Sequence, residues 1–374
     1  MNQSTKSFFS SKTGIIVTGL TIGVIGSTLQ KLGNPKNMGV CVACFERDIA
    51  GALGLHRAAA VQYLRPEIFG FVLGAFIAAL LFKEFRSRGG SSPIIRFVLG
   101  FFAMIGALAF LGCPWRAWFR LAGGDFTAIV GLVGLTVGIL IGIAFLKNGF
   151  SLGRSYKLNN AAGWVMPVIS IALLLFAIFK PLFGAENSGP IFSSESGPGS
   201  MHAPLIISLI AGLLIGFLAQ RTRFCTVGAV RDIALLKDFH LGSGVLALFV
   251  GALVMNLIYG QFNPGYRGQP VAHSNLIWNF MGMLMAGLAY SLAGGCPGRQ
   301  LFLSGEGDTD AGIFVIGMVT GAAFSHNFGL AGTPDAIKDE VLVVGGISQA
   351  GMIAVIIGLC VCLVIGFTMR EKAA

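Results

Sequence analysis

The sequence predicts an all-α polytopic membrane protein made of two inverted homologous halves. Three observations lead to this prediction. The 374 residues are 55% hydrophobic and only 11% charged, with a mean hydropathy of +0.79, whereas soluble proteins carry about 25% charged residues. Apolar segments that approach the roughly 20 residues of a membrane-spanning helix recur ten times. Two cysteine motifs each occur twice, which indicates an internal duplication.

The ten apolar segments divide equally between two repeats. The predicted repeats are 1–183 and 203–374, joined by the linker 184–202, which is rich in Gly, Ser and Pro and has no Lys or Arg. We expect eight to ten spans plus short re-entrant helices, because the segment 203–219 is short. The segments lie near 14–32, 66–82, 93–112, 126–146, 163–183, 203–219, 243–260, 276–295, 311–330 and 342–368.

An odd number of spans per repeat inverts the second repeat relative to the first. With ten spans, the termini and even-numbered loops carry 16 Lys and Arg residues and the odd-numbered loops carry 10, when residues at span ends are counted with the adjacent loop. The positive-inside rule then places both termini in the cytoplasm. The net charge of +10 therefore reflects membrane orientation rather than nucleic-acid binding. Inverted halves would bring matching motifs to the midplane from opposite sides, in an hourglass shape.

The first repeated motif joins a cysteine to Arg-Asp-Ile-Ala, at Cys41–Ala50 and again at Cys225–Ala234. A charge at membrane depth must be compensated. We expect two neutral pairs that lock a short helix, although adjacent residues of a helix do not automatically face each other. The predicted pairs are Arg47 with Asp48 and Arg231 with Asp232.

The second repeated motif is Gly-Cys-Pro-x-Arg followed by Gly-Asp, with Cys113 and Cys296 each 12 residues before an aspartate. Proline favours the first helical position, so each cysteine is predicted at or near an N-cap. Free N–H groups and the positive end of the helix dipole attract anions and activate thiols there. The thiols could hold a sulfur-containing anion by weak S–H contacts, or react with it.

The arginines of the second motif have two alternative roles. Arg116 and Arg299 follow their cysteines by about one helical turn. They could clamp an oxyanion by forked hydrogen bonding, or they could pair with Asp125 and Asp308.

The remaining candidate ligands give weaker signals. Cys44 forms C-x-x-C with Cys41, but no βαβ pattern supports a redox motif and Gly228 stands at the matching place of the second repeat. Cys360 and Cys362 are expected to pack within the last span. The histidines are scattered and repeat no pattern, so no metal site or cofactor is predicted; they are His56, His202, His240, His273 and His326. Gly134 and Gly138 recur at 317 and 321, in a spacing typical of close helix packing in lipid.

This doubled pattern resembles the YeeE/YedE family of bacterial inner-membrane sulfur transporters, over roughly residues 14–369. It is most similar to the YedE-type branch associated with selenium metabolism and with soluble TusA-like (YedF) carriers. The resemblance implies an hourglass-shaped, pseudo-two-fold helical protein in which thiols at the constriction pass thiosulfate along by weak hydrogen bonds. By motif, this role falls to Cys41, Cys113 and Cys296, and to Cys225 at the matching place of the second repeat. The resemblance gives Cys44 no role.

Three functions follow from these observations. The preferred one is a transporter or channel, not an enzyme, for a small sulfur or selenium anion in the bacterial inner membrane, with a soluble TusA/YedF-like carrier as a plausible partner. Soft thiols suit a chalcogen atom, and passage requires weak binding at several sites. The alternatives are a membrane thiol oxidoreductase or persulfide-transferring protein that uses the same cysteines, and a membrane docking scaffold for a soluble carrier.

Overall fold

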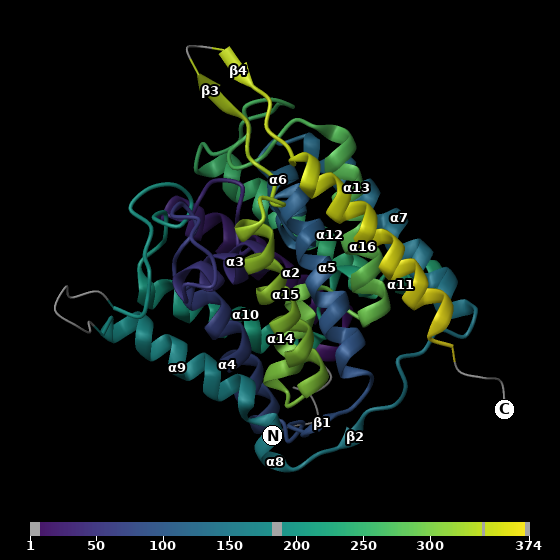
Figure 1. Ribbon diagram of the computed structural model, residues 1–374. Coiled ribbons are helices and arrows are strands. Elements are labelled where there is room, and N and C mark those ends of the chain that lie inside the picture. The colour runs from purple at the N-terminus through teal and green to yellow at the C-terminus, as the bar shows by residue number, and fades with distance from the viewer. Residues whose placement is uncertain (1–7, 182–188, 339–340, 371–374) are drawn as a thin grey trace.

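The computed structural model describes residues 8–181, 189–338 and 341–370, and the described chain is mostly helical with little sheet (Figure 1). The helices of the first half are α2 (Lys12–Lys31), α3 (Val42–Ala52), α4 (Pro66–Leu81), α5 (Pro93–Phe110), α6 (Pro114–Ala122), α7 (Thr127–Lys147), α8 (Asn160–Gly163) and α9 (Val165–Phe179). Those of the second half are α10 (Leu205–Thr222), α11 (Thr226–Leu236), α12 (His240–Ile258), α13 (Leu276–Ala293), α14 (Pro297–Gly305), α15 (Thr309–Asn327) and α16 (Gln349–Thr368).

Each of the ten predicted segments contains one long helix, and the expectation of an all-α polytopic membrane protein is confirmed. Seven helical stretches are long and apolar enough to cross a membrane, and α4 and α9 are shorter apolar helices. α10 is a continuous helix of 18 residues within one of the seven stretches. The last predicted segment begins too early, because β3 (Ala336–Lys338) and β4 (Val341–Val343) form a hairpin and α16 starts only at Gln349.

Long and short helices alternate in the same order in the two halves. Without the four-residue α8, the series α2–α3–α4–α5–α6–α7–α9 has the same lengths, in outline, as the series α10–α11–α12–α13–α14–α15–α16. The short members are α3 and α11, with 11 residues, and α6 and α14, with 9 residues.

Packing between the halves is reciprocal. Helix α2 packs along α12, and its counterpart α10 packs along α4. In the same way α5 packs along α15 and α7 along α13, while α5 and α13 meet each other. Each half therefore completes the packing of the other, and neither buries its long helices alone. The two last helices depart from this rule, since α9 lies on α4 whereas α16 lies on α13 and α5.

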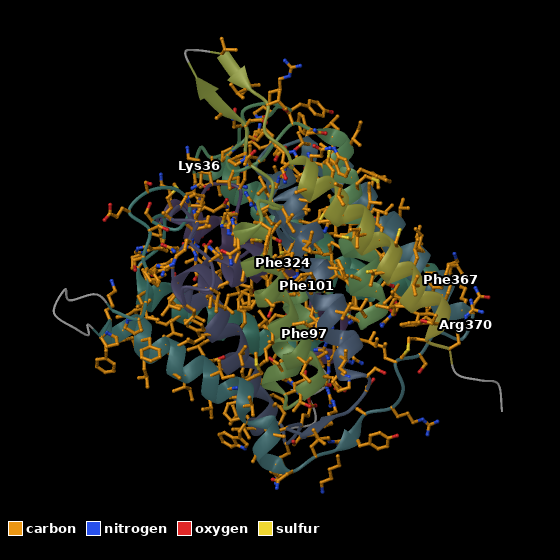
Figure 2. All side chains as sticks on the ribbon, in the orientation of Figure 1. Lys36, Phe97, Phe101, Phe324, Phe367 and Arg370 are labelled. Carbon is orange, nitrogen blue, oxygen red and sulfur yellow. The ribbon has the colours of Figure 1, made fainter. Side chains whose placement is uncertain are left out.

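Glycines allow the close approach of these helix pairs. A Cβ on Gly134 or Gly138 of α7 would collide with a backbone carbonyl of α13, at Phe280 or Leu284. The repeated glycines of α15 meet α5 in the same manner, Gly317 at the Phe97 carbonyl and Gly321 at the Phe101 carbonyl. In Figure 2 the side chains of Phe97, Phe101 and Phe324 lie along this contact, and the rings of Phe101 and Phe324 are 5.4 Å apart. Small residues at such positions drive helix association in lipid.

The loops are small and packed. β1 (Arg88–Gly89) pairs with β2 (Tyr156–Lys157), at the end of the molecule opposite to the β3–β4 hairpin (Figure 1). Within the predicted linker, the part from residue 189 onward hydrogen-bonds to the loop after α3, through Phe192 N to Ala52 O and Gly199 N to Ala60 O. Residues 184–188 of the linker lie outside the described residues.

Replacing Gly138 with leucine should destabilise the protein by about 1–3 kcal/mol, the usual cost of overpacking a filled interior, because the new side chain would separate α7 from α13. Thermal unfolding of the detergent-solubilised protein measures the change. Leu140→Ala on the exposed face of the same helix is the matched control and should leave the midpoint nearly unchanged. An equal shift for both variants would contradict the packing argument.

Candidate functional site

All four repeat cysteines are N-caps of the four short helices. Cys113 and Cys296 have extended backbones and are followed by proline at the first helical position of α6 and α14, so the predicted helix starts are confirmed. Cys41 and Cys225 cap α3 and α11, and each thiol accepts a hydrogen bond from the backbone N–H three residues later, at 3.3 Å for Cys41 and 3.2 Å for Cys225. Four helix N-termini thus each present a thiol where unpaired N–H groups favour negative charge.

The thiols form one pair within each half. The Sγ atoms of Cys225 and Cys296 are 3.7 Å apart, and the backbone N–H of Cys296 lies 3.5 Å from the Cys225 sulfur. In the first half the Cys41 thiol lies beside that of Cys113. All four thiols are free and buried.

Two aromatic side chains connect the thiol pairs. Tyr290 of α13 is fully buried and lies within electrostatic range of Cys113, Cys41 and Cys296. Trp115 of α6 packs onto the start of α14, where a Cβ on Gly298 would lie 3.1 Å from the indole ring. Thiols of both halves therefore lie in the buried interior near Tyr290.

Several buried polar atoms near the thiols have no hydrogen-bond partner among the described residues. They are the Trp115 indole N–H, the Tyr290 hydroxyl, the Gln300 side-chain oxygen and both carboxyl oxygens of Glu46. Buried polar groups are normally satisfied, so each such group requires an explanation. The indole and the hydroxyl are donors that could bind an oxyanion at this position.

A cavity of about 720 Å³ leads to the thiols of the second half. Cys225 and Gly228 form its inner wall, and five basic side chains surround it. Glu84 and Asp232 also line the cavity, each paired with an arginine, so the arginines leave a net positive charge that concentrates anions. The basic residues are Arg221, Arg223, Arg231, His240 and Arg299.

Ion pairs organise the mouth of this cavity. Glu306 is almost fully buried and accepts from Arg223 at 3.1 Å and from Arg299 at 3.3 Å. Glu84 pairs with Arg221 at 2.8 Å. Burial opposes ionisation of Glu84, but hydrogen bonds from Arg221 and Gln220, with the charges of Arg221 and Arg223, lower its pKa below the usual value. The predicted alternative pairing of Arg299 with Asp308 is wrong, because Asp308 accepts from Arg88 at 2.8 Å.

The first half is closed at the equivalent place. Arg116 is fully buried and donates to the carbonyls of Asn37 at 3.2 Å, Val271 at 2.8 Å and Leu111, and to the sulfur of Cys44 at 3.3 Å. These contacts hold the loop before α13 over the Cys41–Cys113 pair. An anion clamp by Arg116 would require them to open.

The predicted alternative pairing of Arg116 with Asp125 is also wrong. Asp125 instead accepts from Arg120 at 2.7 Å, and both residues are fully buried. The first half thus uses a second arginine, four residues after Arg116, for the ion pair that the sequence pattern suggested for Arg116.

The Gly-Asp motifs connect the halves through their backbones. Asp125 forms a parallel bridge with Gly265 of the second half, and Asp308 forms one with Arg88 of the first half. Each loop that closes one end of the molecule is therefore fixed to a motif of the other half.

Arg47 and Asp48 do pair, at 2.7 Å, but a third residue completes the cluster. Arg65, immediately before α4, also bonds Asp48, and all three side chains are buried. Arg65 further donates to the carbonyls of Met201 and Pro198. Arg65 belongs to no repeated motif, so the sequence pattern does not indicate its role. The second-half pair, Arg231 with Asp232 at 2.9 Å, is partly exposed and has no such third member.

One repeated signal among the histidines was overlooked, and the prediction that they repeat no pattern is wrong. His56 and His240 each lie 15 residues after Cys41 and Cys225. His56 contacts the Arg47 carbonyl at 3.0 Å and its ring lies 4.6 Å from that of His326. His240 lines the cavity that reaches Cys225.

Of the other cysteines, the two on α16 take no part in this arrangement, whereas Cys44 lies beside Cys41, to whose thiol its backbone N–H donates at 3.3 Å. Cys362 is buried and Cys360 is exposed on α16. Cys44 forms no disulfide with Cys41 and contacts Arg116 and the Leu111 carbonyl instead. Among the described residues, no group of three or more His, Cys, Asp or Glu side chains could hold a metal ion.

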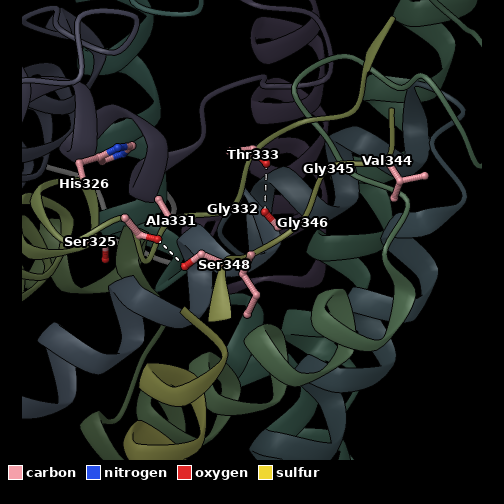
Figure 3. Close-up of a pocket in the computed structure, with 11 residues that line it drawn as sticks. Ser325, His326, Ala331, Gly332, Thr333, Val344, Gly345, Gly346 and Ser348 are labelled. Carbon is pink, nitrogen blue, oxygen red and sulfur yellow. Dashed lines mark hydrogen bonds between the residues drawn. The ribbon is translucent and has the colours of Figure 1, made fainter. Parts of the chain in front are cut away.

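A second cavity, of about 480 Å³, lies beside the β3–β4 hairpin (Figure 3). Ser325 and His326 form one wall, and the strand-like contact of Thr333 with Gly346 forms another. Ser348 closes its floor by donating to the Gly329 carbonyl at 2.7 Å. No cysteine lines it, whereas Cys225 lines the larger cavity described above.

Comparison with known proteins finds similarity to sulphur transport proteins over part of the chain. Residues 221–374 match a family described as sulphur transport. The chain is 38% identical over 103 residues to the thiosulfate transporter TsuA of Spirochaeta thermophila, and 29% identical over 108 residues to that of Escherichia coli. These matches cover 28% and 29% of this chain, and 31% and 30% of the relatives. The match to the sulphur transport family thus lies in the second half of the chain, and the chain spans less than a third of the length of the relatives it matches.

The two Arg-Asp pairs allow a matched stability test. Asp48→Asn leaves two buried guanidinium groups without a counter-charge, and breaking such a cluster typically costs about 3–5 kcal/mol. Asp232→Asn affects a partly exposed pair and should cost less than about 1 kcal/mol. Thermal midpoints of the purified variants compare the two, and similar shifts would contradict the role assigned to burial.

Proposed function

We propose that this protein carries a small sulfur-containing anion, such as thiosulfate, across the bacterial cytoplasmic membrane. The observation that carries the proposal is the convergence of four N-cap thiols in the interior, next to a basic cavity. Thiols are weak donors, and four helix N-termini stabilise negative charge without a tight clamp. The names of the two relatives, both thiosulfate transporters, support transport rather than catalysis.

The proposed path runs between the two thiol pairs. An anion in the basic cavity reaches Cys225 and then Cys296. Tyr290 and Trp115 lie between these thiols and the Cys113–Cys41 pair, and their free O–H and N–H groups supply hydrogen bonds along the way. Each binding step is weak, which passage through a pathway requires. Opening of the far side requires Arg116 to release the loop that contains Val271.

We further infer that the halves are inverted in the membrane, with the Cys225 cavity on the cytoplasmic side. The reciprocal packing of the long helices supports a two-fold relation. In Figure 1, α6 lies toward the end with the β3–β4 hairpin and α14 toward the end with β1. The end of the molecule at which the Cys225 cavity opens also carries the basic residues of the α4–α5, α7–α8 and α10–α12 connections. An excess of basic residues on the cytoplasmic side agrees with the positive-inside rule.

The selenium counterpart of the anion belongs to the same proposal, because a soft thiol also suits a selenium atom. A soluble TusA/YedF-like carrier would receive the cargo at the cytoplasmic cavity. Uptake of radiolabelled selenite beside thiosulfate tests the first point, and co-purification with such a carrier tests the second.

One observation favours a second function, thiol redox or persulfide transfer. The Cys225 and Cys296 sulfurs are 3.7 Å apart, and a small movement would allow a disulfide. Mass spectrometry of the protein after exposure to thiosulfate distinguishes the functions: transport leaves the thiols unmodified, whereas group transfer leaves persulfides or mixed disulfides.

Cys113→Ala and Cys296→Ala should each lower uptake of radiolabelled thiosulfate into vesicles about tenfold or more, since a hydrogen bond to a charged group contributes about 1.5–3 kcal/mol. Cys360→Ala, at an exposed site on α16, is the control and should transport at the wild-type rate. Wild-type uptake in the two central variants would remove these cysteines from the mechanism.

A further inference from the structure

Glu46 is the most unusual buried group that the proposed path leaves unexplained. It lies on α3, five residues after Cys41, and its side chain is 1% exposed. Both of its carboxyl oxygens lack a hydrogen-bond partner. The matching position of the second repeat is Val230, so the packing of the short helix does not itself require a carboxyl group.

A titratable side chain of α13 lies near Glu46. Tyr290, whose hydroxyl also lacks a partner, lies within electrostatic range of Glu46 as well as of Cys113 and Cys41. A carboxylate here would be a buried charge without compensation, whereas a carboxyl group that holds a proton is neutral. The group is therefore placed to bind a proton beside the thiols.

The charged groups on the helices around α3 are engaged elsewhere. Helix α3 packs against α4, α5, α14 and α15. The charged and titratable side chains of these four helices that lie nearest to α3 are bonded to other groups. They therefore do not balance a negative charge on Glu46. Arg47 and Arg65 bond Asp48, Glu67 bonds Asn34 and Ser208, Arg96 bonds the Ser91 and Ala293 carbonyls, Arg299 pairs with Glu306, and His326 stacks on His56.

We propose that Glu46 is a proton-binding site that couples thiosulfate import to proton flow. This inference rests on the proposed function. The carboxylate takes a proton from hydronium on the outer side, giving a carboxyl group and water, and returns it to water on the cytoplasmic side; no electrons move. Import of a dianion is opposed by the negative interior, and each co-transported proton offsets one of its charges.

Proteoliposomes clamped at zero membrane potential test the proposal. With a gradient of one pH unit, acidic outside, each coupled proton supports about tenfold accumulation of radiolabelled thiosulfate. The wild type should reach at least this ratio, and Glu46→Gln should fall below it by about tenfold. Glu67→Gln, which alters a buried carboxyl group of α4 with partners of its own, should accumulate thiosulfate like the wild type.

Exchange of labelled for unlabelled thiosulfate without a gradient separates the two proposals. Glu46→Gln should retain exchange, which also shows that it is folded. A wild type that exchanges but does not accumulate, or a Glu46→Gln variant that accumulates normally, would overturn the role of Glu46 alone. A wild type that neither exchanges nor accumulates thiosulfate would overturn the proposed function itself.

Discussion

The structure depends on reciprocal packing between the two halves. Four helix starts in the interior leave backbone N–H groups unpaired, and such irregular backbone is tolerated at membrane depth only inside protein or along a cavity. The long helices provide that enclosure, because α2 with α12, α4 with α10, α5 with α15 and α7 with α13 close around the short ones. Glycines at these contacts allow the backbones to touch, so the position of every thiol follows from helix packing.

Departures from the repeat distinguish the two ends of the proposed path. Trp115 stands opposite Gly298, Glu46 corresponds to Val230, and Glu306 corresponds to Gly123. The first half is thereby filled and closed, while the second half is open to a basic cavity. On the proposed path, a dianion that enters against a membrane potential of 100 mV requires about 5 kcal/mol from an energy source.

Sequence reasoning located the helices and the cysteines but not their ionic partners. The Gly-Cys-Pro motif predicted two N-cap thiols because proline fits the first helical position, and periodic glycines predicted close packing. The partners of Arg116 and Asp308 could not be predicted, because they are loop carbonyls and a residue of the other half, whose positions have no local signal. The partner of Arg299, Glu306, lies at the end of the same short helix and was overlooked in favour of the repeated aspartate. Arg65 and Glu46 were missed because neither residue is repeated in the second half. The equal spacing of His56 and His240 from Cys41 and Cys225, by contrast, is visible in the sequence.

The central claim is that thiols of both halves line one anion site. A crystal structure with selenosulfate, a selenium analogue of thiosulfate, tests it most directly through the anomalous signal of selenium. The account predicts a selenium peak in the interior between the Cys113 and Cys296 thiols, within contact of both. A peak confined to the basic cavity mouth or to the lipid-facing surface, with none beside these thiols, would contradict it.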